Sequence, residues 1–174
     1  MSLERPQAPW PYDYLPQVPS FEVTSTDISD GETLADKHTA TGGDVSPQLS
    51  WSGFPSDTAA FAITCFDPDA PTGSGWWHWL AHNLDASVTS LDTGAADNMP
   101  DGVVQLRNDS GSTGFAGAAP PPGDIPHRYI FAVHALKQKV DIDPGASCAV
   151  GSFNIIFNVL ARGFLTPVYR IETE

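Results

Sequence analysis

The fold of this chain is decided by residues 61–84, which read FAITCFDPDAPTGSGWWHWLAHNL. Two apolar runs, 60–66 and 78–84, are typical of buried strands. Between them lies the turn Asp67-Pro-Asp-Ala-Pro71, in which two prolines fix φ and withhold backbone donors, so a central strand cannot continue through it. The two carboxylates of the turn are therefore held at the end of a strand, where site residues often gather.

Within thirteen residues of this stretch, two acids and an imidazole occur together with three indoles. Such a set can build a small polar pocket with aromatic walls. Taken singly, each side chain also has a structural explanation, because aspartates beside prolines commonly cap turns and tryptophans commonly pack in cores. The functional interpretation therefore depends on the combination, which consists of Asp67, Asp69, Trp76, Trp77, His78 and Trp79.

The rest of the chain predicts a mainly β protein. Sixteen prolines and fifteen glycines among 174 residues indicate many turns between short strands rather than a helical bundle. Further strands are predicted at 21–25, 46–51, 103–106 and 127–137. The last of these runs is apolar on both faces, so we expect it to lie in the middle of a sheet.

One α-helix is predicted near the C-terminus. Apolar residues recur there at helical spacing and would form one stripe, which consists of Val150, Phe153, Phe157, Leu160 and Phe164. Gly163 and Pro167 are typical stop signals for the end of such a helix.

Two segments differ from the strand-rich remainder. Residues 1–19 hold five prolines together with Trp10, Tyr12 and Tyr14, which predicts an extended arm that packs on the body or on a second subunit. Residues 85–126 form a long loop of small and polar residues, and a loop of that length in a compact domain usually has a function. The expected organisation is the arm followed by a single domain over residues 20–174.

Composition narrows the classes of partner and the compartment. A net charge of −13 repels nucleic acids and anionic membrane surfaces, and the eight basic residues form no run. No segment is long and apolar enough to span a bilayer, and the N-terminus lacks the pattern of a secretory signal. Cys65 and Cys148 are typical of reduced core thiols, with a disulfide between them less favoured. We expect a cytoplasmic protein that binds no nucleic acid and does not insert into a membrane.

Two histidines lead the candidate site. His78 begins one strand and His127 another, so both imidazoles meet the Asp67–Pro71 turn if the two strands enter the sheet from the same end. Backbone N–H groups of Gly117 or Gly123 would complete a compact cradle for an anion.

Other polar residues near these positions receive different interpretations. Arg128 is expected to pair with a carboxylate, for which Asp69 is a reasonable candidate. His82 and His134 lie inside predicted strands, and we assign them no role in the site.

Catalytic and metal-dependent alternatives have weaker support. No histidine or aspartate pair shows tight ligand spacing, so we expect no metal. No Gly-x-Ser-x-Gly elbow is present, and Cys65 lies in an apolar run, so no nucleophile is evident. Phosphate-loop and dinucleotide fingerprints are absent, and no cofactor is expected. A hydrolase that uses histidine and aspartate for acid–base chemistry remains an alternative.

Taken together, the motifs resemble the phosphatidylethanolamine-binding protein family and, within it, the bacterial Raf-kinase-inhibitor-like branch. The similarity covers about residues 18–170 and occurs in the family's order and spacing, in Ser46-Pro-Gln-Leu-Ser-Trp51, Asp67-Pro-Asp-Ala-Pro71, Trp76-Trp-His-Trp79, Pro120-Pro-Pro-Gly123 and His127-Arg-Tyr129. The resemblance implies a fold of two antiparallel β-sheets with a few peripheral helices.

The resemblance also implies a small surface pocket for phosphate-like anions or phospholipid headgroups, in a binding or regulatory protein rather than an enzyme. His78 and His127 would contact the anion, while Asp67 would orient a histidine or meet a headgroup ammonium. Position by position, the implied ligand-binding residues are Asp67, Pro71, Trp76, His78, Gly117, Pro121, His127 and Tyr129, with Asp69 and Arg128 as structural support.

Partners follow from the same resemblance, which implies a homodimer and a regulatory protein partner that the sequence does not name. A protein-interaction module that acts through the N-terminal arm is a further alternative to the binding pocket.

Overall fold

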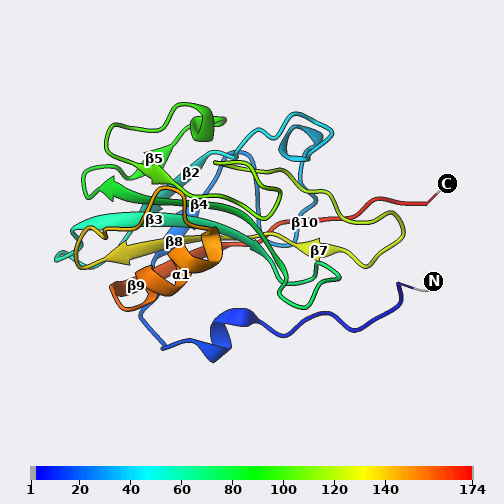
Figure 1. Cartoon of the computed structure of the whole chain (residues 1–174), viewed down its shortest axis with the longest axis horizontal. Coiled ribbons are helices and arrows are strands. Elements are labelled where there is room, and N and C mark those ends of the chain that lie inside the picture. Colours follow the sequence, from blue (N-terminus) through cyan, green and yellow to red (C-terminus); the bar gives the residue numbers. More distant parts are fainter. Residues whose placement is uncertain (1–2, 174) are drawn as a thin grey trace.

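A five-stranded antiparallel sheet runs through the middle of the molecule (Figure 1). The computed structural model describes residues 3–173. In spatial order, the strands of this sheet are β6 (Val104–Gln105), β4 (Trp76–Asp85), β3 (Ala60–Asp67), β8 (Ile130–Leu136) and β9 (Val159–Leu165). The central position of β8 confirms the prediction made from its two apolar faces, because all seven of its residues are buried.

A three-stranded antiparallel sheet packs on one face of the large sheet. Its strands are β1 (Glu22–Thr24), β2 (Leu49–Ser52) and β5 (Ser90–Leu91). The main core lies between the two sheets, where Trp51 of β2 meets Phe61 of β3 with ring centroids 5.4 Å apart. The predicted class, a mainly β fold of two antiparallel sheets, is confirmed.

The opposite face of the large sheet is covered in two parts. The helix α1 (Cys148–Ile156) covers one part and buries a second apolar cluster that includes Leu80 and Ile155. The N-terminal arm covers the other part, and it lies along the lower edge of the molecule in Figure 1. Its short 3-10 helix η1 (Pro11–Tyr14) buries Tyr12 against Phe164 of β9, with ring centroids 4.7 Å apart.

The predicted C-terminal helix is wrong in its extent and in its buried face. The helix α1 ends at Ile156, and Leu160 and Phe164 belong to strand β9. Gly163 is a position of close approach inside β9 rather than a stop signal, because a Cβ there would lie 2.5 Å from Cγ2 of Val23.

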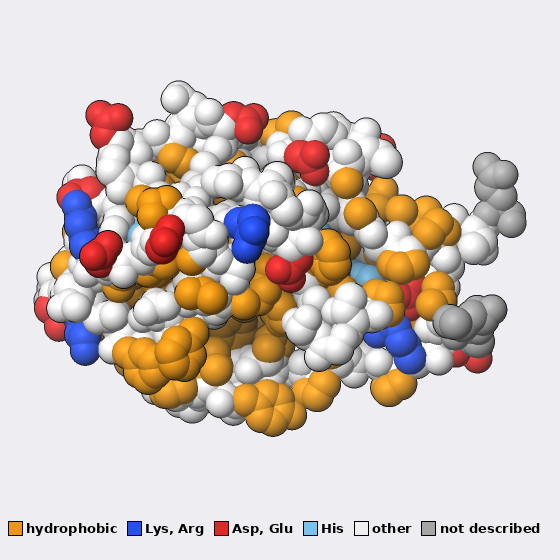
Figure 2. Space-filling model, viewed as in Figure 1, with side chains coloured by type: hydrophobic (Ala, Val, Ile, Leu, Met, Phe, Trp, Pro, Cys, Tyr) orange, Lys and Arg blue, Asp and Glu red, His pale blue; other side chains and the backbone are white. Residues whose placement is uncertain are grey.

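The predicted apolar stripe of α1 faces solvent. Val150, Phe153 and Phe157 are 49%, 67% and 67% exposed, and Figure 2 shows apolar side chains gathered on this face of the molecule. The helix instead buries Cys148, Gly151 and Ile155, and Gly151 is required there because a Cβ would lie 2.3 Å from Cδ1 of Leu106. The face of α1 that packs is therefore decided by the limited space at Gly151, which the spacing of apolar residues in the sequence does not reveal.

The predicted strand 127–137 is divided at Tyr129. Its first two residues form β7 (His127–Arg128), which pairs with β10 (Val168–Tyr169) rather than with the large sheet. This break turns the side chains of β7 toward the turn that follows β3. The remaining short helices are η2 (Asp36–His38) and η3 (Ala95–Asp97).

Two further expectations concern the thiols and the membrane. Cys65 and Cys148 are both free and buried, as expected for core thiols. None of the helices in the described part of the chain has the length and apolar character needed to cross a bilayer.

Candidate functional site

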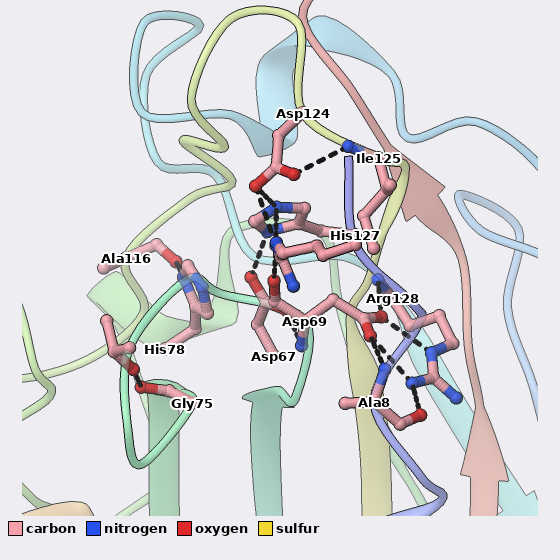
Figure 3. Close-up of polar contacts among 12 residues, drawn as sticks. Ala8, Asp67, Asp69, Gly75, His78, Ala116, Asp124, Ile125, His127 and Arg128 are labelled. Atoms are coloured by element: carbon pink, nitrogen blue, oxygen red, sulfur yellow. Dashed lines mark hydrogen bonds and ion pairs between the residues drawn. The ribbon is translucent and has the colours of Figure 1, made fainter. Parts of the chain in front are cut away.

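Two aspartates, one at the end of β3 and one in the turn after it, form hydrogen bonds with the two residues of β7. Asp67 Oδ2 accepts a hydrogen bond of 2.7 Å from Nδ1 of His127. Two residues later, Asp69 accepts hydrogen bonds from Nε and Nη2 of Arg128 at 2.7 and 2.8 Å, so the expected ion pair is present (Figure 3). The two aspartates of the turn, Asp67 and Asp69, therefore pair with the two consecutive residues of β7, His127 and Arg128.

The turn itself is shaped by a side chain and a glycine. Asp67 Oδ1 accepts a hydrogen bond of 2.7 Å from the backbone N–H of Asp69, which fixes the direction of both carboxylates. Farther along, Gly75 has φ +64°, and a Cβ there would lie 2.5 Å from Cζ of Phe66. Trp76 follows at once as the first residue of β4 and lines the cavity described below.

His127 lies between two carboxylates. Its Nε2 donates to Oδ2 of Asp124 at 3.0 Å, on the side of the ring opposite Asp67 (Figure 3). Burial disfavours a charged imidazole, but the hydrogen bonds from the ring to Asp67 and Asp124 outweigh burial and raise the pKa of His127. The ring is 1% exposed, and each of its nitrogens lies at a carboxylate oxygen, an arrangement that favours the imidazolium form.

His78 has the opposite environment. Its Nδ1 donates to the carbonyl oxygen of Ala116 at 2.8 Å, and its own carbonyl accepts a hydrogen bond from the N–H of Ala116. Burial lowers the pKa of His78, although the hydrogen bond to Ala116 and the charge of Asp67 act against it. The ring is therefore neutral near pH 7, and Nδ1 is the ring nitrogen that Ala116 engages.

Tyr129 stands beside His78 with an unpartnered hydroxyl. The two rings meet edge to face with centroids 5.2 Å apart. The hydroxyl of Tyr129 is buried and makes no hydrogen bond within the described residues. Burial, reinforced by the charge of Asp67, raises the pKa of Tyr129, so the hydroxyl stays protonated and is a donor.

One cavity of about 430 Å³ collects the predicted residues. Its walls combine apolar surfaces, such as Phe115 and Ala119, with the polar groups described above. All eight residues predicted to bind a ligand line it, namely Asp67, Pro71, Trp76, His78, Gly117, Pro121, His127 and Tyr129. Their part in binding stays a prediction, whereas their convergence is a property of the fold.

The predicted backbone donors of the cavity are wrong. The N–H of Gly117 donates to Oδ1 of Asp44 at 2.6 Å, and the N–H of Gly123 donates to the carbonyl of Ile171 at 2.8 Å. Gly117 is instead required by close packing, because a Cβ there would lie 2.4 Å from the carbonyl carbon of Thr39. The candidate anion donors are therefore side chains.

Three charged residues near the cavity were missed by sequence reasoning. Asp44 lines the cavity with an exposed carboxylate. Asp124 lies three residues before His127 and was hidden in the long loop, although that spacing was a usable signal. Arg5 is the sole basic residue of the arm, and its Nη2 lies 2.7 Å from Oδ2 of Asp124, a contact that no local pattern predicts.

Metal ligands are not assembled at this site. Within residues 3–173, no group of three or more histidine, cysteine, aspartate or glutamate side chains is placed to hold a metal ion. The carboxylates nearest His127 are engaged with that ring, with backbone N–H groups or with Arg5.

Comparison with known proteins places this geometry in a family. The profile of the family described as phosphatidylethanolamine-binding protein matches residues 24–170. The chain belongs to this family. It is 48% identical over 166 residues to the UPF0098 protein YbcL of Escherichia coli, covering 90% of this chain and 91% of that relative. It is 47% identical over 158 residues to the UPF0098 protein YbhB of the same organism, covering 86% and 99%.

Solved structures agree with the sequence comparison. The crystal structure of Escherichia coli YbcL, described as a new member of the mammalian family, superimposes with a TM-score of 0.84 at 48% identity and covers 87% of this chain and 99% of that one. The family profile matches residues 24–170, a range that includes all the residues lining the cavity. Arg5 lies outside this range.

Proposed function

We propose that this chain is a non-catalytic binding protein whose cavity holds a small phosphorylated headgroup. The observation that supports this most is the hydroxyl of Tyr129, a residue of the cavity wall, which is buried and has no partner within the described residues. The ring of His78 beside it uses Nδ1 for the carbonyl of Ala116 and leaves Nε2 for a ligand. Buried polar groups without partners are costly, so such groups facing a cavity indicate a ligand that completes them.

The chemistry of the two groups suits a phosphoryl oxygen. The hydroxyl of Tyr129 donates to an anionic oxygen. His78 Nε2 accepts the proton of a monoanionic phosphate ester, or takes up a proton and donates to a dianion. In a chain with a net charge of −13, the ligand must be held by these short contacts, because the long-range field repels it.

The rim of the cavity suits a cation. Asp44 uses one carboxylate oxygen for the N–H of Gly117, and its exposed side chain leaves the other oxygen for a ligand. An ammonium group linked to the phosphate would find its counter-charge there. Phosphoethanolamine carries both groups, and the name of the family, phosphatidylethanolamine-binding protein, supports this class.

Titration calorimetry with inorganic phosphate and with phosphoethanolamine tests the proposal. Tyr129→Phe removes the hydroxyl alone, and we expect at least a fivefold loss of affinity for both ligands, as for one lost hydrogen bond to a charged group. Tyr14→Phe is the control, because Tyr14 is 75% exposed on the arm and does not line the cavity. Equal affinities of wild type and Tyr129→Phe would contradict the proposal.

Further expectations of the sequence accompany this proposal. We propose that the protein acts in the cytoplasm as a homodimer and through a regulatory partner, on the basis of the family resemblance. Light scattering on the full chain measures the mass in solution, and turnover in a phosphoester screen would favour the hydrolase alternative over non-catalytic binding.

A further inference from the structure

The N-terminal arm brings one cation beside His127, which lines the cavity. Nη2 of Arg5 donates to Oδ2 of Asp124 at 2.7 Å and to the carbonyl oxygen of Asp69, and it lies 3.5 Å from Nε2 of His127. The side chain of Arg5 is 25% exposed and that of Asp124 is fully covered. Arg5 does not line the cavity, so any effect on a ligand acts through its neighbours.

The contact between Arg5 and Asp124 affects the net charge around His127. Asp67 and Asp124 each carry a negative charge beside His127, whose imidazolium balances one of them. The second carboxylate is balanced by Arg5. Contacts with Arg5 and with His127 hold the pKa of Asp124 at about 2 against the effect of burial, so this carboxylate is charged. Without Arg5, the cluster of Asp67, Asp124 and His127 would carry one uncompensated negative charge.

The neighbouring ion pair between Arg128 and Asp69 cannot compensate Asp124 in place of Arg5. Arg128 is committed to Asp69, which accepts hydrogen bonds from its Nε, its Nη2 and its backbone N–H. That pair is neutral as a unit. Within the described residues, Arg5 is therefore the cation that adds to His127 in compensating Asp67 and Asp124.

The arm is held in place by contacts that do not involve Arg5. The N–H of Ala8 donates to Asp69 at 3.0 Å, and the carbonyl of Ala8 accepts a hydrogen bond of 2.5 Å from Arg128. Farther along, Trp10 packs edge to face on Phe164 with ring centroids 5.4 Å apart. The backbone beside Arg5 is thus positioned independently, and a substitution of Arg5 changes charge without releasing the arm.

We propose that Arg5 is a positioning residue that makes the cavity accept an anion, by neutralising Asp124 beside His127. This inference rests on the proposed function and adds a residue from outside the matched family range, 24–170. A unit charge at the distance of a neighbouring side chain is worth roughly fivefold or more in affinity at a protein's effective dielectric.

Calorimetry with inorganic phosphate at pH 7 tests the inference on the full chain. We expect Arg5→Gln to bind phosphate about fivefold or more weakly, and Arg5→Lys to retain most of the affinity because it keeps the charge. Lys139→Gln is the charge-matched control, since Lys139 is 58% exposed, pairs with Asp85 and does not line the cavity.

A second readout separates electrostatics from mere stability of the arm. The charged groups that face His127 are Asp67 at the end of β3, Asp124 in the preceding loop and Arg5 of the arm, with His78 also lining the cavity. Loss of the Arg5 cation should raise the pKa of His127 in an NMR titration of Arg5→Gln, and Arg5→Lys should restore it.

The outcomes of the two measurements are distinct. Phosphate binding by wild type with equal affinity in Arg5→Gln overturns the role of Arg5 and leaves the proposed function intact. An unchanged pKa of His127 in Arg5→Gln also overturns that role. Absence of phosphate and phosphoethanolamine binding in wild type overturns both proposals.

Discussion

At the scale of single residues, the cavity holds two buried histidines in opposite charge states. Asp67 and Asp124 bracket the ring of His127 and raise its pKa, which favours the charged form, whereas burial lowers the pKa of His78 and favours the neutral form. Under the proposed function, His78 is therefore the group whose protonation would couple ligand binding to pH. Since burial lowers its pKa below the ordinary histidine value of about 6.5, it gains a proton only as the pH falls below that value.

We predict that the affinity for a divalent anion rises as the pH falls below about 6.5, by several-fold per pH unit, because the protonated His78 becomes a donor. Sulfate is the appropriate probe for calorimetry, since its own charge does not change over this range. His78→Gln should abolish the pH dependence. His82→Gln should retain it, because His82 is buried on the same strand and does not line the cavity. An affinity of wild type that does not vary with pH would refute a direct contact with His78.

How well the sequence predicts a site residue depends on how far along the chain its contact partner lies. Asp67, His78 and His127 follow from position, because a proline-bounded turn and two strand starts place them at one end of the sheet. Gly117 and Gly123 were misassigned because glycine is equally required where two backbones approach, and periodicity does not distinguish the two uses. Arg5 could not be predicted, because 119 residues separate it from Asp124 in sequence.

At the scale of elements, strands were predicted better than the helix. The strands β3, β4 and β8 are long and buried, so composition alone reveals them. The apolar spacing after Val150 continues by coincidence from α1 into β9, because the chain turns between Ile156 and Val159 without a glycine or proline to mark the break. The side of the helix that packs was hidden for a different reason, since Gly151 and Cys148 are small and do not look like a core face.

The reversed face of α1 gives a prediction of stability. Ile155→Ala should lower the free energy of unfolding by about 2–4 kcal/mol, because Ile155 is 2% exposed and packs in the cluster under the helix. Phe153→Ala should change it by less than about 1 kcal/mol, since Phe153 is 67% exposed and alanine favours the helix. Urea unfolding of the two variants measures the difference, and a larger effect at Phe153 would contradict the packing described.

At the scale of the whole molecule, the sheet is covered on both faces only when the arm is included. The small sheet covers one face, and α1 leaves part of the other face to residues of the arm. Beneath the arm, Arg162 of β9 is 5% exposed, donates through Nε to Nδ1 of His134 at 3.1 Å, and stacks on the ring of Tyr12 at 4.9 Å. The arm therefore shields a buried cation as well as apolar surface.

This arrangement predicts that the arm stabilises the body of the molecule as well as supplying Arg5. Tyr12→Ala should lower the free energy of unfolding by about 3 kcal/mol, because it opens a cavity beside Phe164 and removes the ring that covers Arg162. Tyr14→Ala is the matched control, since Tyr14 is 75% exposed in the same short helix and should cost less than about 0.5 kcal/mol. Equal urea midpoints for the two variants would show that the arm does not contribute to the core. A loss of stability in Tyr12→Ala but not in Tyr14→Ala would mean that the packing of Tyr12, which completes the cover of the sheet, also anchors the end of the chain that carries Arg5.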